Sequence, residues 1–123
     1  MERLRKRAAF KAVAGGRRVA RQGFVLQGLK VDAGSDDTGG TRGPCIGFTV
    51  TKKIGNAVVR NRIRRRLREA VRRAATHAED GTDYVIVARA AALTLPFERL
   101  ITGLVTGFDA LGRDSKPKTG SHA

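Results

Sequence analysis

The segment that most constrains this chain is residues 52–73, KKIGNAVVRNRIRRRLREAVRR. Ten of its side chains are Lys or Arg and only Glu69 is acidic, so the segment has a net charge of +9. Charges of one sign this close together repel one another unless water or a polyanion surrounds them. The segment must therefore lie on the surface of the fold, and it predicts a partner with dense negative charge.

The same segment has the periodicity of an amphipathic helix over residues 57–75. Asn56, just before it, is of a residue type that caps helix N-termini. At about 100° per residue, the residues on the apolar side are Val59, Ile63, Leu67, Ala70 and Ala74. Those on the opposite side are Asn61, Arg65, Arg68 and Arg72, and those that flank the apolar stripe are Arg60, Arg64 and Arg66. The pattern predicts a helix that packs on a core and turns guanidinium groups toward a partner.

The rest of the chain predicts one α+β domain. Its elements are a short helix over 4–14 ended by Gly15-Gly16, strands over 24–31, 45–51 and 84–89, and a final helix from Pro96 to Leu111. Residues 33–44 are rich in Gly and Asp, and Asp36-Asp37 is predicted to lie in a solvated loop rather than a metal site. No linker or repeat divides residues 1–111, and residues 112–123 are predicted to form a disordered tail.

The strand at 45–51 alternates between two kinds of side chain. Its apolar set is Ile46, Phe48 and Val50, and its small, polar set is Gly47, Thr49 and Thr51. Such alternation is typical of a sheet with one face in a core. The other face is either simply solvated or open to a ligand lying across it. The strand alone favours the solvated interpretation.

Two basic segments account for the whole charge surplus. Residues 1–30 carry +8 and residues 52–73 carry +9, whereas residues 31–51 carry −2 and residues 74–123 carry −1, which sums to +14. Nucleic acid is the first candidate partner and an anionic membrane surface the second. Arg outnumbers Lys in the basic helix, and the guanidinium fork suits the converging phosphates of folded RNA, or almost equally a DNA groove. Backbone N–H groups near Gly55 add a further place for a phosphate.

No pattern in the sequence predicts a catalytic or metal site. The chain has one Cys and two His, its eleven acidic residues are scattered, and it has no Gly-rich nucleotide motif. His77 is predicted to be a surface residue, and His122 lies in the predicted tail. Cys45 cannot form an internal disulfide, which is typical of a cytoplasmic protein. No apolar stretch is long enough to cross a bilayer.

The run TVTKKIGNAVVRNRIRRRLREA resembles the signature of the bacterial ribonuclease P protein subunit. The matching groups are Lys52-Lys53, Arg60-Asn61-Arg62, Arg64-Arg65 and Arg68-Glu69. Phe10, the strand at 24–26 and the strand at 84–89 also lie where that family has them, so the resemblance covers residues 3–111. It implies an αβββαβα fold with a mostly antiparallel sheet. It also implies a left-handed crossover through the basic helix, where the general rule would predict a right-handed one.

The resemblance also implies a division of labour within a ribonucleoprotein hydrolase. In that family a catalytic RNA with bound Mg²⁺ cuts the 5′ leader from precursor tRNA, and the protein binds both RNAs without a catalytic residue of its own. The implied partners are the catalytic RNA and precursor tRNA, with no membrane and no obligate protein partner. A structural nucleic-acid-binding protein and a stand-alone nuclease are the competing interpretations.

The family's contacts can be transferred only to matching residues. The residues expected at the catalytic RNA are Lys52, Lys53, Asn56, Arg60, Asn61, Arg62, Arg64, Arg65, Arg68 and Arg72. The residues expected in the leader cleft, between the first helix and the open sheet face, are Phe10, Gln27, Thr49, Thr51 and Arg89. Ala14 and Gln27 stand where the family often has aromatic residues, and Ala90 where it often has a basic one. The chain is therefore expected to bind the leader with less stacking and more backbone electrostatics.

Overall fold

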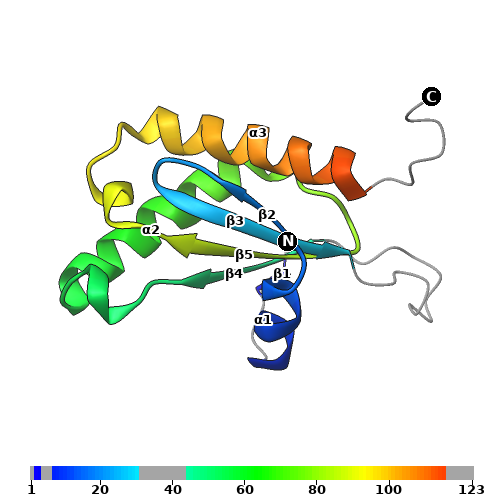
Figure 1. Cartoon of the computed structure of the whole chain (residues 1–123). Helices are drawn as coiled ribbons and strands as arrows, with labels where there is room; N and C mark the ends of the chain where they lie inside the picture. The colour runs from blue at the N-terminus through cyan, green and yellow to red at the C-terminus, as the bar shows by residue number, and fades with distance from the viewer. Residues whose placement is uncertain (1, 4–6, 31–43, 116–123) are drawn as a thin grey trace.

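The computed structural model describes residues 2–3, 7–30 and 44–115. The main elements are β1 (Glu2–Arg3), α1 (Arg7–Ala14), β2 (Arg17–Ala20), β3 (Phe24–Lys30), β4 (Cys45–Thr49), α2 (Ala57–Ala74), β5 (Thr82–Ala88) and α3 (Phe97–Ser115). Short 3-10 helices, η2 (Lys52–Ile54), η3 (Ala75–His77) and η4 (Ala90–Leu93), follow β4, α2 and β5. The predicted α+β class and αβββαβα order are confirmed, with the two-residue β1 added before α1 (Figure 1).

The strands form one sheet in the order β1-β4-β5-β3-β2. Of the three pairings among β2 to β5, two are antiparallel, so this part of the sheet is mostly antiparallel as predicted. β4 and β5 are parallel neighbours, and the basic helix α2 is the crossover between them. The left hand of this crossover stays a prediction from the resemblance.

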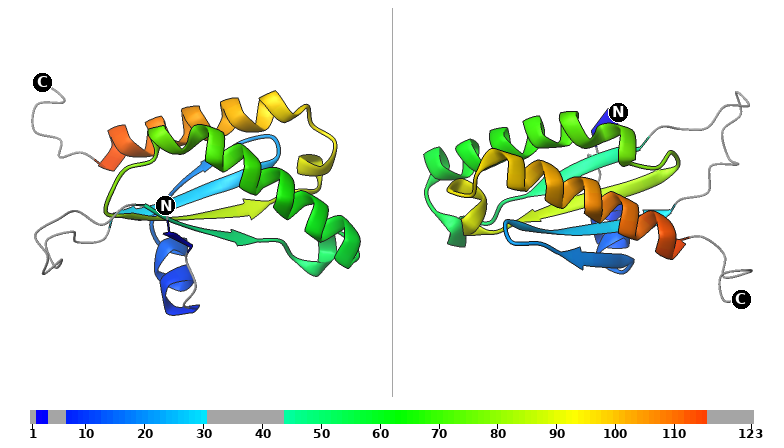
Figure 2. Two further views of the ribbon diagram at one scale, coloured as in Figure 1. Left: turned by 180° about the vertical axis from the view of Figure 1, so that it is seen from behind. Right: turned by 90° about the horizontal axis from the view of Figure 1, so that it is seen from above.

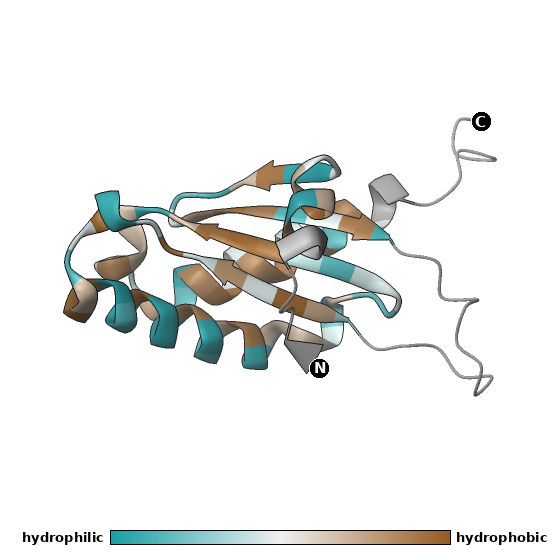
Figure 3. Cartoon of the chain, turned by 90° about the horizontal axis from the view of Figure 1, so that it is seen from below, coloured by the Kyte–Doolittle hydropathy of each residue, from teal (hydrophilic) through white to brown (hydrophobic). Residues whose placement is uncertain are grey.

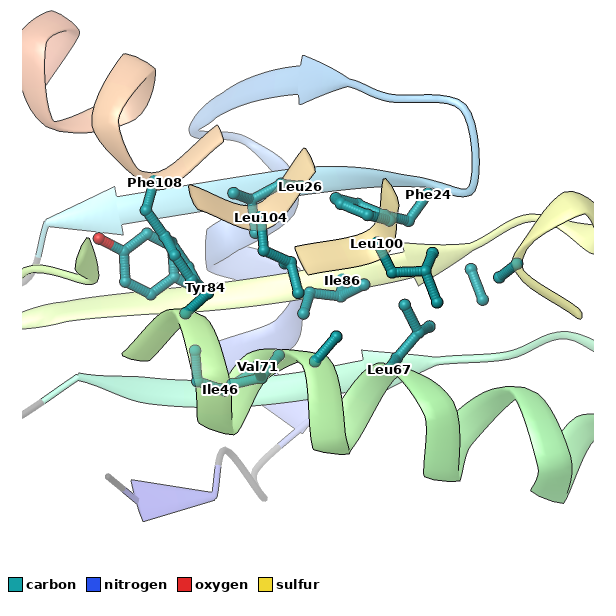
Figure 4. Packing of buried hydrophobic residues seen from close by; sticks show 14 of the residues in the cluster. Phe24, Leu26, Ile46, Leu67, Val71, Tyr84, Ile86, Leu100, Leu104 and Phe108 are labelled. Atoms are coloured by element: carbon teal, nitrogen blue, oxygen red, sulfur yellow. The ribbon is translucent and has the colours of Figure 1, made fainter. Parts of the chain in front are cut away.

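Two helices cover one face of the sheet and the third lies on the other. Figures 1 and 2 show α2 and α3 side by side over one face, with α1 on the opposite side. The main core fills the space beneath α2 and α3 (Figure 4). Its largest members are Phe24, Leu26, Ile63, Leu67, Tyr84, Ile86, Leu100, Leu104 and Phe108. A smaller cluster of Val13, Cys45 and Val85 joins α1 to the other face, where Phe10 packs against it.

Packing in the core also changes the acidity of Tyr84. The Tyr84 ring meets Phe108 edge-on, with centroids 4.8 Å apart. Its hydroxyl oxygen accepts a hydrogen bond from the backbone N–H of Glu79 at 2.9 Å. Burial disfavours the tyrosinate and raises the pKa of Tyr84. None of the helices in the described ranges is long and apolar enough to cross a membrane.

The basic helix begins as its sequence predicts, but its predicted apolar stripe needs two corrections, because Val59 is only half-buried and Val71, which was not predicted, is buried. The Asn56 side chain accepts a hydrogen bond from the N–H of Val59 at 3.0 Å, which is the N-cap interaction. Its buried side is Ile63, Leu67, Ala70, Val71 and Ala74. Gly55 comes so close to Val59 that a Cβ at Gly55 would lie 3.0 Å from a Val59 methyl carbon. The chain therefore enters α2 along a path that favours glycine.

Several predicted boundaries need correction. The four-residue strand β2 was not predicted from its own residues, and β5 begins at Thr82 rather than 84. Residues 112–115 are helical, although they were predicted to belong to the tail. Gly112 is buried within this last part of α3, next to the Glu79 carboxylate, so packing keeps the residue helical despite its low helix propensity. Residues 4–6 of the first helix, Asp36-Asp37, and residues 116–123 with His122 lie outside the described residues.

Replacing the capping side chain of Asn56 should destabilise the protein in the absence of RNA. Asn56→Ala leaves an N–H of the first turn of α2 without its partner and should lower the free energy of unfolding by about 1 kcal/mol. Asn56→Asp should retain most of that stability. Urea denaturation measures both, with Val58→Ala as the matched control because Val58 is 67% exposed. An Asn56→Ala loss no larger than that of the control would contradict the capping role.

Candidate nucleic-acid interface

The outer side of α2 carries most of the predicted RNA-binding residues. Figure 3 shows hydrophilic and hydrophobic bands alternating along this helix. The exposed members of the predicted set are Lys52, Lys53, Asn56, Asn61, Arg62, Arg65, Arg68 and Arg72. A shallow depression on this side is lined by Arg62, Arg65, Arg66, Arg68, Glu69, Arg72 and Phe97. The structure thus gathers these side chains on one surface, hereafter the α2 surface.

Arg60 and Arg64 are half-buried and lie along the helix. Arg60 Nε donates to the carbonyl of Gly55 at 3.2 Å, and Arg64 Nη1 donates to Asn61 Oδ1 at 3.0 Å. Arg68 is held differently, with its Cζ 5.9 Å from the centre of the Phe48 ring. Local contacts therefore restrain three of the guanidinium groups before any ligand binds, which lowers the entropic cost of a phosphate contact.

Glu69 makes the charge uneven along the helix. Its two carboxylate oxygens accept from Arg72 at 3.1 Å and from Arg73 at 3.4 Å. The Arg72 side chain is 73% exposed, so this ion pair contributes little to stability. It does lower the local positive potential near the end of α2. The stretch from Lys52 to Arg65, by contrast, contains no acidic side chain.

Arg66 is the arginine of α2 whose guanidinium hydrogen-bonds to backbone carbonyls of a distant segment. It is half-buried, and its Nη1 donates to the backbone carbonyls of Ala92 at 2.7 Å and Leu93 at 2.9 Å. Its Nη2 donates to the carbonyl of Leu95. The sequence places Arg66 beside the apolar stripe but gives no sign of these partners, because they lie 26 or more residues away.

Two of the predicted leader residues, Gln27 and Thr49, lie on the other face of the sheet. Register places Gln27 beside Val85 and Thr49 beside Val87, and strand alternation turns all four away from α2 and α3. Thr51 and Arg89 follow the ends of β4 and β5, and both are exposed. This open face is the second candidate surface.

The open face is apolar at one end of the strands and polar at the other. At one end Phe10 packs half-buried beside Val13 and Val85, and α1 covers the sheet. At the other end lie Thr49 and the exposed Arg89. An extended strand of RNA would therefore meet apolar side chains at one end and a guanidinium at the other. Ala14 is exposed at the end of α1, so no aromatic ring stands there.

Sequence reasoning missed Arg18 as a member of the open face. In the β2–β3 pairing Arg18 is the partner of Gln27, so both side chains lie on this face. Arg18 is exposed and brings a guanidinium to the β2 edge of the surface. The sequence signal was the run Arg17 to Ala20, but four residues gave too short a pattern to recognise as a strand.

The described side chains provide no ligand set for a metal ion. Among the described side chains, those of residues 10–30 and 44–112, no three or more His, Cys, Asp or Glu come close enough to hold one. His77 is exposed, as predicted, with Nδ1 3.1 Å from an oxygen of Asp109. What the surfaces offer instead is guanidinium, ammonium, amide and hydroxyl groups, which are the groups that hold phosphates and sugars.

A family model described as ribonuclease P matches residues 1–112. The chain belongs to the ribonuclease P protein family. The ribonuclease P protein component of Bartonella quintana is 48% identical over 121 residues, covering 95% of this chain and 83% of that protein. That of Brucella suis is 46% identical over 114 residues, covering 89% and 79%. The resemblance inferred from the arginine-rich signature is confirmed.

Solved ribonuclease P proteins have the same fold. The Staphylococcus aureus ribonuclease P protein matches with a TM-score of 0.69 at 26% identity, covering 90% of this chain and 95% of that one. The Thermotoga maritima protein matches with a TM-score of 0.66 at 27% identity, covering 86% and 97%. The predicted α+β fold of this family is thereby confirmed.

Proposed function

We propose that this chain is the protein component of a ribonuclease P ribonucleoprotein. In this proposal the α2 surface binds the catalytic RNA, and the open face binds the 5′ leader of precursor tRNA. The observation that carries it is the placement of the two surfaces, because α2 lies over one face of the sheet and the leader residues lie on the other. A small domain built in this way can hold two RNA segments at once.

The α2 surface suits a folded RNA. Arg60, Arg64 and Arg68 are restrained by neighbours, and Arg62 and Arg65 extend from the same helix into solvent. Guanidinium groups at several angles can each hold a phosphate in a bidentate manner. Asn61 adds an amide that can contact a sugar or a base edge. Lys52, Lys53 and Asn56 continue this surface around the start of α2.

The open face suits a single strand. Small side chains near Gly47 and Thr49 leave space for bases, while Arg18 on the edge strand β2 and Arg89 after the central strand β5 can hold backbone phosphates. Phe10 is the one aromatic residue of the predicted cleft, and it is half-buried. Stacking contributes about 1–3 kcal/mol per base where a platform exists. We therefore assign a larger share of leader binding to electrostatics in this chain.

The chemistry is assigned to the RNA partner. Mg²⁺ held mainly by that RNA would supply the activated water and stabilise the leaving oxygen. The residues of this chain bind and orient the two RNAs, so no catalytic residue is assigned to it. We place this activity in the cytoplasm, the compartment that suits a chain with a single cysteine.

Two alternatives make different predictions for the same preparations. A structural nucleic-acid-binding protein would use the same basic helix but would bind precursor and mature tRNA equally. A stand-alone nuclease would cut RNA by itself. The second alternative has a parallel in one similar structure, that of a Staphylococcus aureus ribonuclease P protein mutant described as defective in mRNA degradation activity.

Reconstitution with a bacterial ribonuclease P RNA tests the proposal. The combined protein and RNA should remove the leader from precursor tRNA at Mg²⁺ concentrations too low for the RNA alone, because the basic surfaces neutralise phosphate repulsion. The protein without RNA should leave both precursor tRNA and mRNA intact. Gel analysis of the 5′ ends measures this. Leader removal by the protein alone would contradict the proposal.

Loss of two guanidinium groups from the α2 surface should weaken assembly with the catalytic RNA. Arg65→Ala with Arg68→Ala should reduce affinity and lower the slope of log K against log salt by about 1 for each lost phosphate contact. Arg99→Ala serves as the control, because Arg99 is exposed on α3 away from this surface. The assignment of these two residues would fail if the salt slope stayed at the wild-type value.

A substitution of Phe10 should weaken binding of the 5′ leader and leave binding of the mature part of the tRNA unchanged. Phe10→Leu keeps an apolar side chain against Val13 but removes the ring, and should weaken binding of leader-bearing precursor by roughly fivefold. Binding of mature tRNA should not change. Ala14→Phe is the complementary variant, since this exposed position can present a ring and should tighten precursor binding. Equal losses for precursor and mature tRNA in Phe10→Leu would place Phe10 outside the leader site.

A further inference from the structure

Arg66 links the basic helix to the segment that follows Arg89. From the middle of α2 its guanidinium reaches the end of η4 and the turn into α3, where it donates to the carbonyls of Ala92, Leu93 and Leu95. The last carbonyls of a short helix have no partners within that helix. Arg66 provides such partners from another element, and the planar fork with five donors makes this possible for arginine alone.

The segment held in this way begins at Arg89. The N–H of Arg89 donates to the carbonyl of Gly23 at 2.9 Å, and its own carbonyl accepts from the N–H of Ala92 at 2.9 Å. Ala92 is fully buried and packs in the main core. The backbone of Arg89 is therefore bonded to Gly23, just before β3, on one side and to η4 on the other, and Arg66 bonds η4 to α2.

We propose that Arg66 is a positioning residue that fixes Arg89 for the leader and does not contact RNA. The inference deepens the proposed function and rests on it, because Arg89 is assigned there to the leader surface. It gives two arginines of one helix different roles. Arg65 is exposed and binds the catalytic RNA, whereas the adjacent Arg66 connects the α2 surface to the open face.

The first test uses the protein alone. Arg66→Ala should accelerate hydrogen–deuterium exchange at residues 89–95, because three carbonyl interactions of this segment are lost. Arg66→Lys keeps the charge but offers a single ammonium group, so its exchange should lie between wild type and Arg66→Ala. Arg65→Ala is the matched control and should leave exchange in this segment unchanged. Unchanged exchange in Arg66→Ala would overturn the positioning role.

The second test uses the reconstituted complex. Arg66→Ala should reduce the preference for precursor over mature tRNA by about threefold to tenfold, in line with loosening rather than removing one charged contact. Its salt slope for the catalytic RNA should stay at the wild-type value, whereas Arg65→Ala should lower the slope by about 1. An equal fall in slope for Arg66→Ala would show that Arg66 binds RNA, and the proposal would be wrong.

A double-mutant cycle shows whether Arg66 acts through Arg89. If it does, Arg66→Ala should reduce leader preference in the wild-type background and cause no further loss when Arg89→Ala is already present. Additive losses would overturn the proposal. Should Arg66→Ala fail to fold, Arg66→Lys takes its place in the cycle. A wild-type complex without leader preference would overturn the proposed function itself, an outcome distinct from unchanged exchange in the variant.

Discussion

Burial of the apolar stripe of α2 is the interaction on which the rest of this structure depends. Ile63, Leu67 and Val71 pack against the sheet and α3, and each such side chain contributes about 1.5–3 kcal/mol when it is fully buried. That gain offsets the repulsion among the guanidinium groups that the same helix holds on its outer side. Within this helix Glu69 is the one acidic side chain, so the repulsion is largely left for solvent and a partner to relieve. The inner side of α2 is stabilised by the core, whereas the positive charges on its outer side remain largely uncompensated.

The sheet separates the two candidate surfaces. β4 and β5 carry large apolar side chains toward α2 and α3, and small or short ones toward α1. The period of two along a strand therefore divides one short sequence between a core and an open face. Arg66 and η4 connect the two sides through hydrogen bonds, not through the sheet. If both surfaces bind RNA as proposed, these few polar contacts would couple the two sites.

Much of the fold and of the α2 surface could be predicted from particular residues of the sequence. Asn56, the stripe from Val59 to Ala74 and the alternation at 46–51 predicted the basic helix, its cap and the buried face of β4. The arginine-rich signature predicted the family. Prediction failed where a pattern was short or where packing overruled propensity, as in the four residues of β2 and in the helical Gly112. Arg18 was missed as a consequence, because only the β2–β3 register places it beside Gln27.

The sequence by itself determined the local properties: which segment is a basic helix, which side of it is apolar, and which family the chain belongs to. Only the tertiary structure decided which arginines remain available for a ligand. Arg65 and Arg66 are chemically identical neighbours in the sequence, yet one is exposed and the other is bound to carbonyls from residues 92–95. The physical reason is that helical periodicity fixes the direction of a side chain relative to its own helix. What that side chain meets depends on segments that come close only when the whole chain has folded.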